Sequence, residues 1–262
     1  MKNSNILLVI SCLIASLLCN CTKDNLSISV TPSPSNSLQP LVYTSMSTTI
    51  MGSKVNTWIE YDQDRTPLII AIKIPVKMIE PLPIYKSTIY GKHALQIFYV
   101  ELPTSKYNNQ LFNHAMIVYS PSGFSPGVFQ FPHMSFNFYI NGKEEAQYYN
   151  GDISGHIASR LPQGFEPVSP VKSFGEIWVP TNSSINKECY ISHEISAGVL
   201  SNQLAFYGPL ASIEFLKSHP AISQPIPLPQ EYSRSGYYPT QYSINQVGEE
   251  IHISLEKFVF HP

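Results

Sequence analysis

The sequence predicts a mainly β protein, folded as a β-sandwich or an open barrel with one or two short peripheral helices. The chain holds 22 Pro, 16 Tyr and 13 Phe residues but only 13% charged residues, which favours strands and ordered loops over long charged helices. Several segments alternate polar and apolar residues, as half-buried strands do. The 262 residues, 43% of them hydrophobic, suffice for a sizeable core, and we assign residues 41–262 to a single β-rich domain.

The first 20 residues read as a cleavable signal peptide. Lys2 precedes an apolar run from Ile6 to Leu18. This run is shorter than the stretch of about 20 residues that crosses a bilayer as a helix. We therefore expect the segment to be removed during export.

The end of this run resembles a lipobox, the site where a cysteine receives a diacylglyceryl group. Cys21 keeps an aliphatic residue, Leu18, three places before it, although Asn20 is unusual at the cleavage position. Cys19 is the alternative, and it fits less well because a small residue normally precedes the lipidated cysteine. Residues 22–24, Thr-Lys-Asp, resemble the short export signal of surface lipoproteins in the Bacteroidetes. We expect lipidation at Cys21; a plain secretory signal with incidental cysteines is the remaining alternative.

This resemblance implies a cell-envelope protein that is anchored to a bacterial membrane by its N-terminal lipid. Residues 21–40 are rich in Ser, Thr, Asn and Pro and have few large apolar side chains, so we expect a disordered tether. A linker of about 20 residues spans roughly 25 Å, which lifts a domain clear of the lipid headgroups and permits surface exposure. Cys189 is the only cysteine beyond the tether, and we expect it to be a small buried side chain rather than a nucleophile.

The first half of the domain contains a hairpin and a central strand. Residues 42–51 and 55–61 read as strands joined at Gly52-Ser53, and the second of them alternates polar and apolar residues. Residues 68–74 form a nearly continuous apolar run, typical of a central strand. A short helical turn is expected around residues 77–80. Further strands are expected at residues 95–102 and 114–119.

The second half is predicted as short strands, a helix and connections. We expect a long loop at residues 151–170 and a proline-rich connection at 220–229. A helix is expected at residues 210–218, with Pro209 at an early position. Residues 251–260 alternate like a half-exposed strand. Short strands are expected at residues 176–180, 189–195 and 204–207.

One predicted strand presents a polar face that is a candidate ligand site. From His133 onward the chain alternates, so His133, Ser135, Asn137 and Tyr139 share one face while Met, Phe and Ile fill the other. Residues two apart on a strand lie about 6.6 Å apart on the same side, close enough to reach one small ligand. His114 begins the preceding strand, and a His114–His133 pair could donate to an anion or a polar ligand. The alternative is that His133 only satisfies a neighbouring strand.

This stretch resembles the motif Pro-His-Phe-Asp-x-His-Phe-Tyr of a family of secreted bacterial β-rich proteins for which no activity is established. The likeness extends, at low identity, over most of residues 50–260. It is carried by residues 55–83, 114–139, 161–165, 174–178 and 238–242. The resemblance implies an architecture more than a function.

The same resemblance implies that a metal site of the family is degenerate in this chain. The family pattern would place His, Asp and His at positions 133, 135 and 137, a set able to bind a divalent cation. Here only His133 remains, because Ser135 and Asn137 replace the other two. Phe124 and Ile177 stand where two further histidines would be. We therefore expect neither a metal nor a cofactor.

Other chemistries find little support in the sequence. Residues 123–127 match the Gly-x-Ser-x-Gly nucleophile elbow, but Pro126 has no N–H for an oxyanion hole, so we interpret the match as a turn. A net charge of -2 and a pI near 6.4 provide no basic stripe for nucleic acid.

The remaining histidines, His252 among them, are expected at the surface. Aromatic residues that would suit a sugar-stacking platform, unless they belong to the core, are Trp58, Trp178, Tyr237 and Tyr238.

Three hypotheses about function follow. The first is a non-catalytic envelope lipoprotein whose β domain binds a small ligand or a protein partner. The second is a metal-dependent enzyme that uses His133 with ligands not yet placed. The third is a surface lipoprotein that binds glycans through exposed aromatic side chains.

Overall fold

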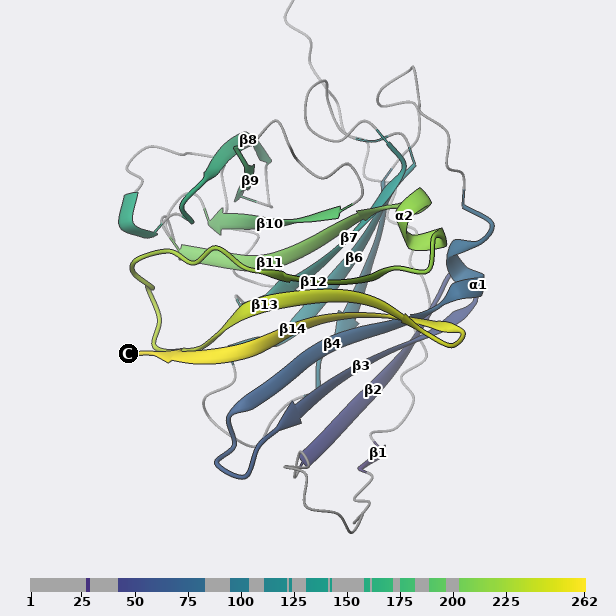
Figure 1. Ribbon diagram of the computed structural model, residues 1–262, viewed down its shortest axis with the longest axis horizontal. Helices are drawn as coiled ribbons and strands as arrows, with labels where there is room; N and C mark the ends of the chain where they lie inside the picture. Colours follow the sequence, from purple (N-terminus) through teal and green to yellow (C-terminus); the bar gives the residue numbers. More distant parts are fainter. Residues whose placement is uncertain are drawn as a thin grey trace, which may run out of the picture.

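A computed structural model describes most of the expected domain. The described residues are 27–28, 42–82, 95–103, 111–121, 123, 131–140, 142, 158–160, 162–171, 175–181, 189–196 and 203–262. Within them the chain is mainly β, with two antiparallel sheets of seven strands and two short helices (Figure 1). The predicted fold class is confirmed.

The first sheet collects strands from both ends of the chain. Its strand order is β1-β2-β3-β4-β14-β13-β12, so the C-terminal strand pairs with β4 in the interior of the sheet. This long-range pairing joins residues 69–75 to residues 250–256. The strands are β1 (Ser27–Ile28), β2 (Val42–Ile50), β3 (Ser53–Tyr61), β4 (Pro67–Pro75), β12 (Ala221–Pro225), β13 (Gly236–Val247) and β14 (Glu250–His261).

The second sheet is built from the middle of the chain. Its strand order is β5-β6-β7-β11-β10-β9-β8, with β5 and β8 at the two edges. The strands are β5 (Gln96–Glu101), β6 (His114–Ser120), β7 (His133–Tyr139), β8 (Phe165–Val171), β9 (Gly175–Pro180), β10 (Cys189–Ser196) and β11 (Gln203–Ser212).

The inner faces of the two sheets share one hydrophobic core. Ile72 and Ile253 pair across β4 and β14 in the first sheet, and both are fully buried. Ile117 and Phe136 pair across β6 and β7 in the second sheet and belong to the same cluster. In Figure 1, β6 and β7 accordingly pass behind the first sheet. Burial of this apolar surface between the layers is the main stabilising term of the fold.

The predicted hairpin and the predicted central strand are confirmed, but the turn of the hairpin lies one residue earlier than the predicted Gly52-Ser53. β2 and β3 pair in register through Ile50 and Ser53, and Met51 and Gly52 form the turn with φ angles of 50° and 72°. Two positive φ angles at the centre of a two-residue loop match the twist of the flanking strands. β4 lies between β3 and β14, as its continuous apolar run predicts.

Two short helices meet at one end of the sandwich. α1 (Val76–Ile79) confirms the helical turn expected after the central strand. α2 (Ile213–Lys217) begins at Ser212, whose hydroxyl accepts a hydrogen bond of 3.0 Å from the backbone N–H of Phe215. The ammonium group of Lys217 donates to the carbonyl of Leu82 just beyond α1, which ties the two helices together. Among the described residues, none of the helices has the length and hydrophobicity of a transmembrane helix.

Two predicted connections contain strands instead. The long loop expected at residues 151–170 is wrong in its last part, because β8 occupies Phe165–Val171 despite Pro167 and Pro170. β8 is an edge strand, where missing N–H groups are tolerated. The proline-rich connection expected at 220–229 likewise contains β12, which is the opposite edge of the first sheet.

The predicted start of the helix is also wrong, and one strand was not predicted. Leu210 to Ser212 extend β11, because they pair with β7, and α2 begins only at Ile213. Pro209 therefore lies within a strand rather than in the first turn of a helix. β13 is absent from the prediction, although its pairing with β14 runs from Gly236 to Val247.

The predictions for the N-terminus fall largely outside the described residues. The expected signal peptide and the expected lipidation site, Cys21, lie outside them entirely. In the expected tether, only Ser27 and Ile28 are described, and they pair with Ser45 and Thr44 of β2.

Candidate functional site

The candidate site lies on the outer face of the second sheet. Strand alternation turns Met134, Phe136 and Phe138 of β7 into the core and directs His133, Ser135, Asn137 and Tyr139 to the opposite face. This division is the one that the sequence predicts. The neighbouring strands β6 and β11 present their own alternate residues on the same outer face.

The register of the sheet sets the neighbours of each predicted site residue. His133 pairs with Ser120 of β6 and with Ser212 of β11. Ser135 pairs with Val118 and Leu210, and Asn137 pairs with Met116. We call Ser120, His133, Ser135 and Asn137 the polar strip. It runs along β6 and β7 with apolar side chains beside it.

The polar strip is buried, although it faces away from the core of the sandwich. The exposed fractions are 1% for His133 and Ser120, 7% for Ser135 and 5% for Asn137. Tyr139 and His114, the other two predicted site residues, are 5% and 3% exposed. These side chains therefore lie in a low-dielectric environment, where every polar atom needs a partner.

Burial and one hydrogen bond determine the state of His133. Its Nδ1 donates to the carbonyl oxygen of Phe131 at 2.8 Å, which leaves Nε2 as the acceptor nitrogen of the ring. Burial lowers the pKa of His133 to about 4, and the hydrogen bond to Phe131 opposes that shift only in part. The ring is neutral at physiological pH, so it presents an acceptor rather than a positive charge.

The polar strip also contains two buried oxygen atoms that make no hydrogen bond within the described residues. Oδ1 of Asn137 and Oγ of Ser120 are inaccessible to solvent, and neither makes a hydrogen bond in the described part of the chain. An unsatisfied buried polar group costs about 1–3 kcal/mol, so native proteins rarely keep one without a reason. Binding of a ligand that donates hydrogen bonds to these atoms would be such a reason.

His114 and His133 do not form the pair that the sequence suggests. His114 lies opposite Tyr139, six residues along β7 from His133, which corresponds to about 20 Å. Its ring stacks on Tyr139 with centroids 4.7 Å apart and planes 7° apart. Its Nδ1 also donates to the side-chain oxygen of Asn113. His114 is therefore part of an aromatic stack at the far end of the face.

Apolar side chains surround the polar strip and continue to the sheet edge. Met116, Val118, Tyr139 and Phe206 form a second hydrophobic cluster, separate from the core between the sheets. Next to it, alternate residues of the edge strand β5 are exposed. Ile97 pairs with Val118 and is 38% exposed, while Tyr99 pairs with Met116 and is 52% exposed. The face thus runs from a buried polar strip to an exposed aromatic edge.

The described residues give no support to a metal centre at His133. No group of three or more His, Cys, Asp or Glu side chains within them is arranged to hold a metal ion. The register neighbours of His133 are the serines Ser120 and Ser212. Serine hydroxyls are poor ligands for the transition metals that bind imidazole.

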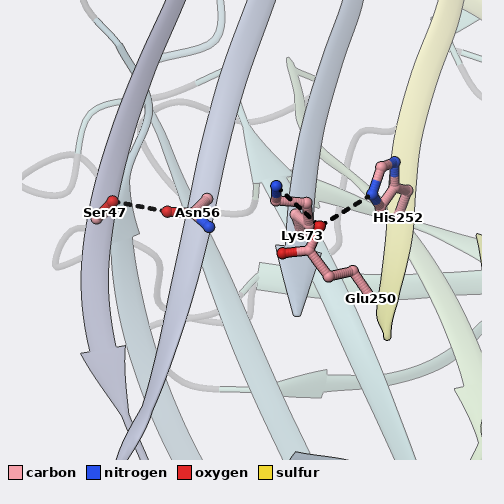
Figure 2. Close-up of polar contacts among 5 residues, drawn as sticks. All are labelled: Ser47, Asn56, Lys73, Glu250 and His252. Carbon is pink, nitrogen blue, oxygen red and sulfur yellow. Dashed lines mark hydrogen bonds and ion pairs between the residues drawn. The ribbon is translucent and has the colours of Figure 1, made fainter. Parts of the chain in front are cut away.

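A second polar face, which sequence reasoning did not single out, lies on the outside of the first sheet. Figure 2 shows Ser47, Asn56, Lys73 and His252 side by side on β2, β3, β4 and β14, with Glu250 next to them. Ser47 donates to Oδ1 of Asn56 at 2.6 Å, and Lys73 forms an ion pair of 2.9 Å with Glu250. The period-two pattern of residues 250–256 was the signal for this row, because Glu, His, Ser and Glu alternate there with Ile and Leu.

His252 on this face does not form a catalytic triad. Its Nε2 lies 3.8 Å from Oε2 of Glu250, longer than a hydrogen bond. Burial and the nearby Lys73 lower the pKa of His252, whereas Glu250 raises it less strongly. Ser254, the next outward residue, donates instead to Glu256 at 2.5 Å. A hydroxyl held by a carboxylate in this way is not activated by the imidazole.

The aromatic residues proposed as a sugar platform do not come together. Trp178 of β9 and Tyr238 of β13 belong to the core between the sheets. Trp58 lies on the outer face of the first sheet, packed edge-on against His252 with ring centroids 5.2 Å apart. Tyr237 packs edge-on against Phe260 at 5.3 Å. Of the four residues, Trp178 and Tyr238 are therefore core side chains and cannot form a sugar platform.

Two further sequence predictions concern possible nucleophiles. Cys189 is 3% exposed and belongs to the core cluster, as predicted for a small buried side chain. Of the segment that matches the nucleophile elbow, only Gly123 lies within the described residues.

Comparisons with family models, with curated proteins and with solved structures find no match to this chain. The site must therefore be interpreted from its own geometry.

Proposed function

We propose that this chain is a lipid-anchored protein of a bacterial cell envelope whose β-sandwich binds a ligand without catalysing a reaction. The observation that carries the binding role is the polar strip, where Oδ1 of Asn137 is buried and accepts no hydrogen bond from the described residues. A buried oxygen without a hydrogen bond destabilises the fold, and a ligand that donates a hydrogen bond to it removes that cost. The lipobox around Cys21 supports the anchoring role.

The binding role is tested on the purified full chain with a panel of neutral, anionic and cationic small molecules. We expect at least one compound to raise the thermal unfolding midpoint, because a ligand that binds only the folded state stabilises it. We expect that shift to disappear in Asn137→Leu. The matched control is Asn245→Leu, a change of the same kind on the outer face of the first sheet. A panel without any stabilising compound would count against a binding role.

The anchoring role is tested by changing the two candidate cysteines. We expect Cys21→Ser to abolish incorporation of labelled palmitate and to release the protein from the membrane fraction, because a serine cannot carry the thioether lipid. Cys19→Ser is the matched control and should leave both unchanged. Mass spectrometry of the mature N-terminus measures the same point directly, and an unmodified Cys21 would overturn the anchor.

A further inference from the structure

The short strand β1 fixes the N-terminal segment to the edge of the first sheet. Ser27 pairs with Ser45 and Ile28 pairs with Thr44, and the two strands are antiparallel. β1 is the outermost strand on that side of the sheet. The link between the proposed lipid on Cys21 and the domain therefore runs only from residue 21 to residue 27, a step of six residues.

The direction of β1 and the shortness of this link limit where the lipid can lie. Six residues reach about 20 Å at full extension. Because β1 is antiparallel to β2, its N-terminal end points along β2 towards the turn at Met51 and Gly52. The step from Ser45 to Met51 is also about 20 Å along a strand. A lipid on Cys21 thus reaches the level of this turn, whereas the level of Gln63, beyond the other end of β3, requires the chain to reverse its direction.

Exposed apolar side chains mark the same end of the first sheet. β4 ends at Pro75, beside the start of β3 on one side and the start of β14 on the other, so the β2–β3 turn and the β13–β14 turn lie at one end. In Figure 1 the β13–β14 turn accordingly lies next to α1. Met51 is 40% exposed in the first turn, and Val247 is 57% exposed before the second. We call this end of the first sheet, with Met51 and Val247 as its tips, the turn end.

The charges at the turn end do not favour one class of lipid headgroup. Among the described residues, lysines and glutamates balance around the two turns and the two helices. They are Lys54, Lys73, Lys77, Lys217, Glu80, Glu214, Glu249 and Glu250. This balance provides no cationic surface for anionic lipids. Exposed apolar side chains at the tips suit shallow insertion among headgroups instead, because insertion removes apolar surface from water.

Apolar exposure alone does not distinguish the two ends of the first sheet. At the opposite end, Val259 and Phe260 are 47% and 50% exposed. The direction of β1 makes the distinction, because the chain leaves Ser27 away from that end. The turn end combines exposed apolar tips with a short and direct link to the lipid.

We propose that the turn end rests on the lipid bilayer, with Met51 and Val247 among the headgroups and the strands of the first sheet directed away from the membrane. This inference rests on the proposed lipid anchor at Cys21 and adds an orientation to it. β3 extends over nine residues, so its far end lies about 30 Å farther from the lipid. The anchor and the turn end together hold the domain in one orientation.

The experiment measures how close each end of β3 lies to the membrane. The full lipidated chain is incorporated into phosphatidylcholine vesicles in which some lipids carry a nitroxide quencher on the headgroup. A fluorophore is attached to Lys54→Cys at the turn end or to Gln63→Cys at the opposite end, both at exposed positions. Cys189 is 3% exposed and is not labelled under native conditions. We expect quenching to be at least about twofold stronger at position 54, because about 30 Å separates the two levels.

Two further variants test the parts of the contact. Val247→Asp should weaken quenching at position 54, since a carboxylate does not enter the headgroup region as an apolar tip does. Val259→Asp is the matched control at the opposite end and should leave quenching unchanged. Joint replacement of Ser27 and Ile28 by proline removes both N–H groups of β1, so it should release the link from β2 and reduce the difference between the two labels. High salt should have little effect, because the charges at the turn end balance.

The contrary outcomes separate the orientation from the anchor. Equal quenching at the two positions, or stronger quenching at position 63, overturns the orientation while the lipid anchor stands. Quenching at position 54 that responds equally to Val247→Asp and Val259→Asp overturns the role of the apolar tip. If mass spectrometry finds Cys21 unmodified, the anchor and this inference fail together. The two labels decide the orientation without any buried substitution, so the result does not depend on a variant that folds poorly.

Discussion

His133 is held neutral by its surroundings, and that gives it a measurable effect on stability. Its pKa is about 4 in the folded chain and about 6.5 in an unfolded one, so the unfolded state takes up the proton first as the pH falls. Above pH 6.5 the ring is neutral in both states, and its burial does not lower the free energy of unfolding. As the pH falls from 6.5 towards 4, protonation of the unfolded state lowers the free energy of unfolding. A difference of this size corresponds to about 3 kcal/mol at pH 4.

We expect His133→Asn to reduce this acid sensitivity. Asparagine keeps an N–H near the position of Nδ1, so the hydrogen bond to the carbonyl of Phe131 is retained while the titrating ring is removed. Urea unfolding of both proteins at pH 7 and pH 4 measures the effect. The wild type should lose about 3 kcal/mol more than the variant over this interval. Equal losses in the two proteins would show that His133 does not titrate in this range.

At this scale the sequence predicted the composition of the candidate site but not its environment. Alternation along β7 separates His133, Ser135 and Asn137 from the core side chains, because the period of a strand is a local property. The partners of His133 depend on the register between strands far apart in the chain, which no local pattern encodes. Burial of the outward face was equally unpredictable, since polar residues at alternate positions normally indicate contact with water.

At the level of elements, the β2–β3 turn contains a residue that does not suit its conformation. Met51 adopts a φ of 50°, a region that costs most side chains energy and that Asn tolerates better. Asn followed by Gly is also the pair preferred in two-residue hairpin loops with two positive φ angles. The turn therefore offers a clear route to stabilisation.

We expect Met51→Asn to raise the free energy of unfolding by about 0.5–1 kcal/mol. Met51 is 40% exposed, so little packing is lost. Met51→Val is the opposite control and should lower stability, because a β-branched side chain is disfavoured at positive φ. Chemical denaturation of the three proteins measures both changes, and the reverse order would contradict this account of the turn.

Most strands were predictable, and the failures have a common physical origin. β8 and β12 were missed because their prolines indicate loops, whereas an edge strand tolerates a missing N–H. β13 was missed although Tyr238, Tyr242 and Ile244 point into the core. Pro239 and the polar residues between them obscure its alternation. The signal that could have revealed it is Gly248, which has a φ of 59° in the turn before β14.

At the scale of the whole molecule, the fold class followed from composition and alternation, because both describe how much apolar surface must be buried between layers. The order of the strands within each sheet could not be predicted from composition and alternation. β4 pairs with a strand that begins at residue 250, and a pairing over that distance leaves no trace in local sequence. The polar row of Lys73 and His252 arises from this pairing, which is why it was not anticipated.

We expect the core between the sheets to be most sensitive along β14. Ile253 is fully buried in that core, and Ile253→Ala should reduce the free energy of unfolding by about 2–5 kcal/mol. Val259 on the same strand is 47% exposed, so Val259→Ala should change stability by less than about 0.5 kcal/mol. Equilibrium unfolding compares the two variants. Similar losses from both would mean that β14 is not packed as described.

The position of β14 also has a consequence for the order in which the chain acquires its structure. β4 leaves the ribosome early, but its partner on one side is formed by residues 250–261. Until those residues have been synthesised, β4 has no partner strand on that side, and the central strand β14 of the first sheet is missing. Contacts that close so late slow folding. The export that we propose for this chain would benefit from that delay, because a polypeptide that has not yet folded can still be threaded through a translocation pore.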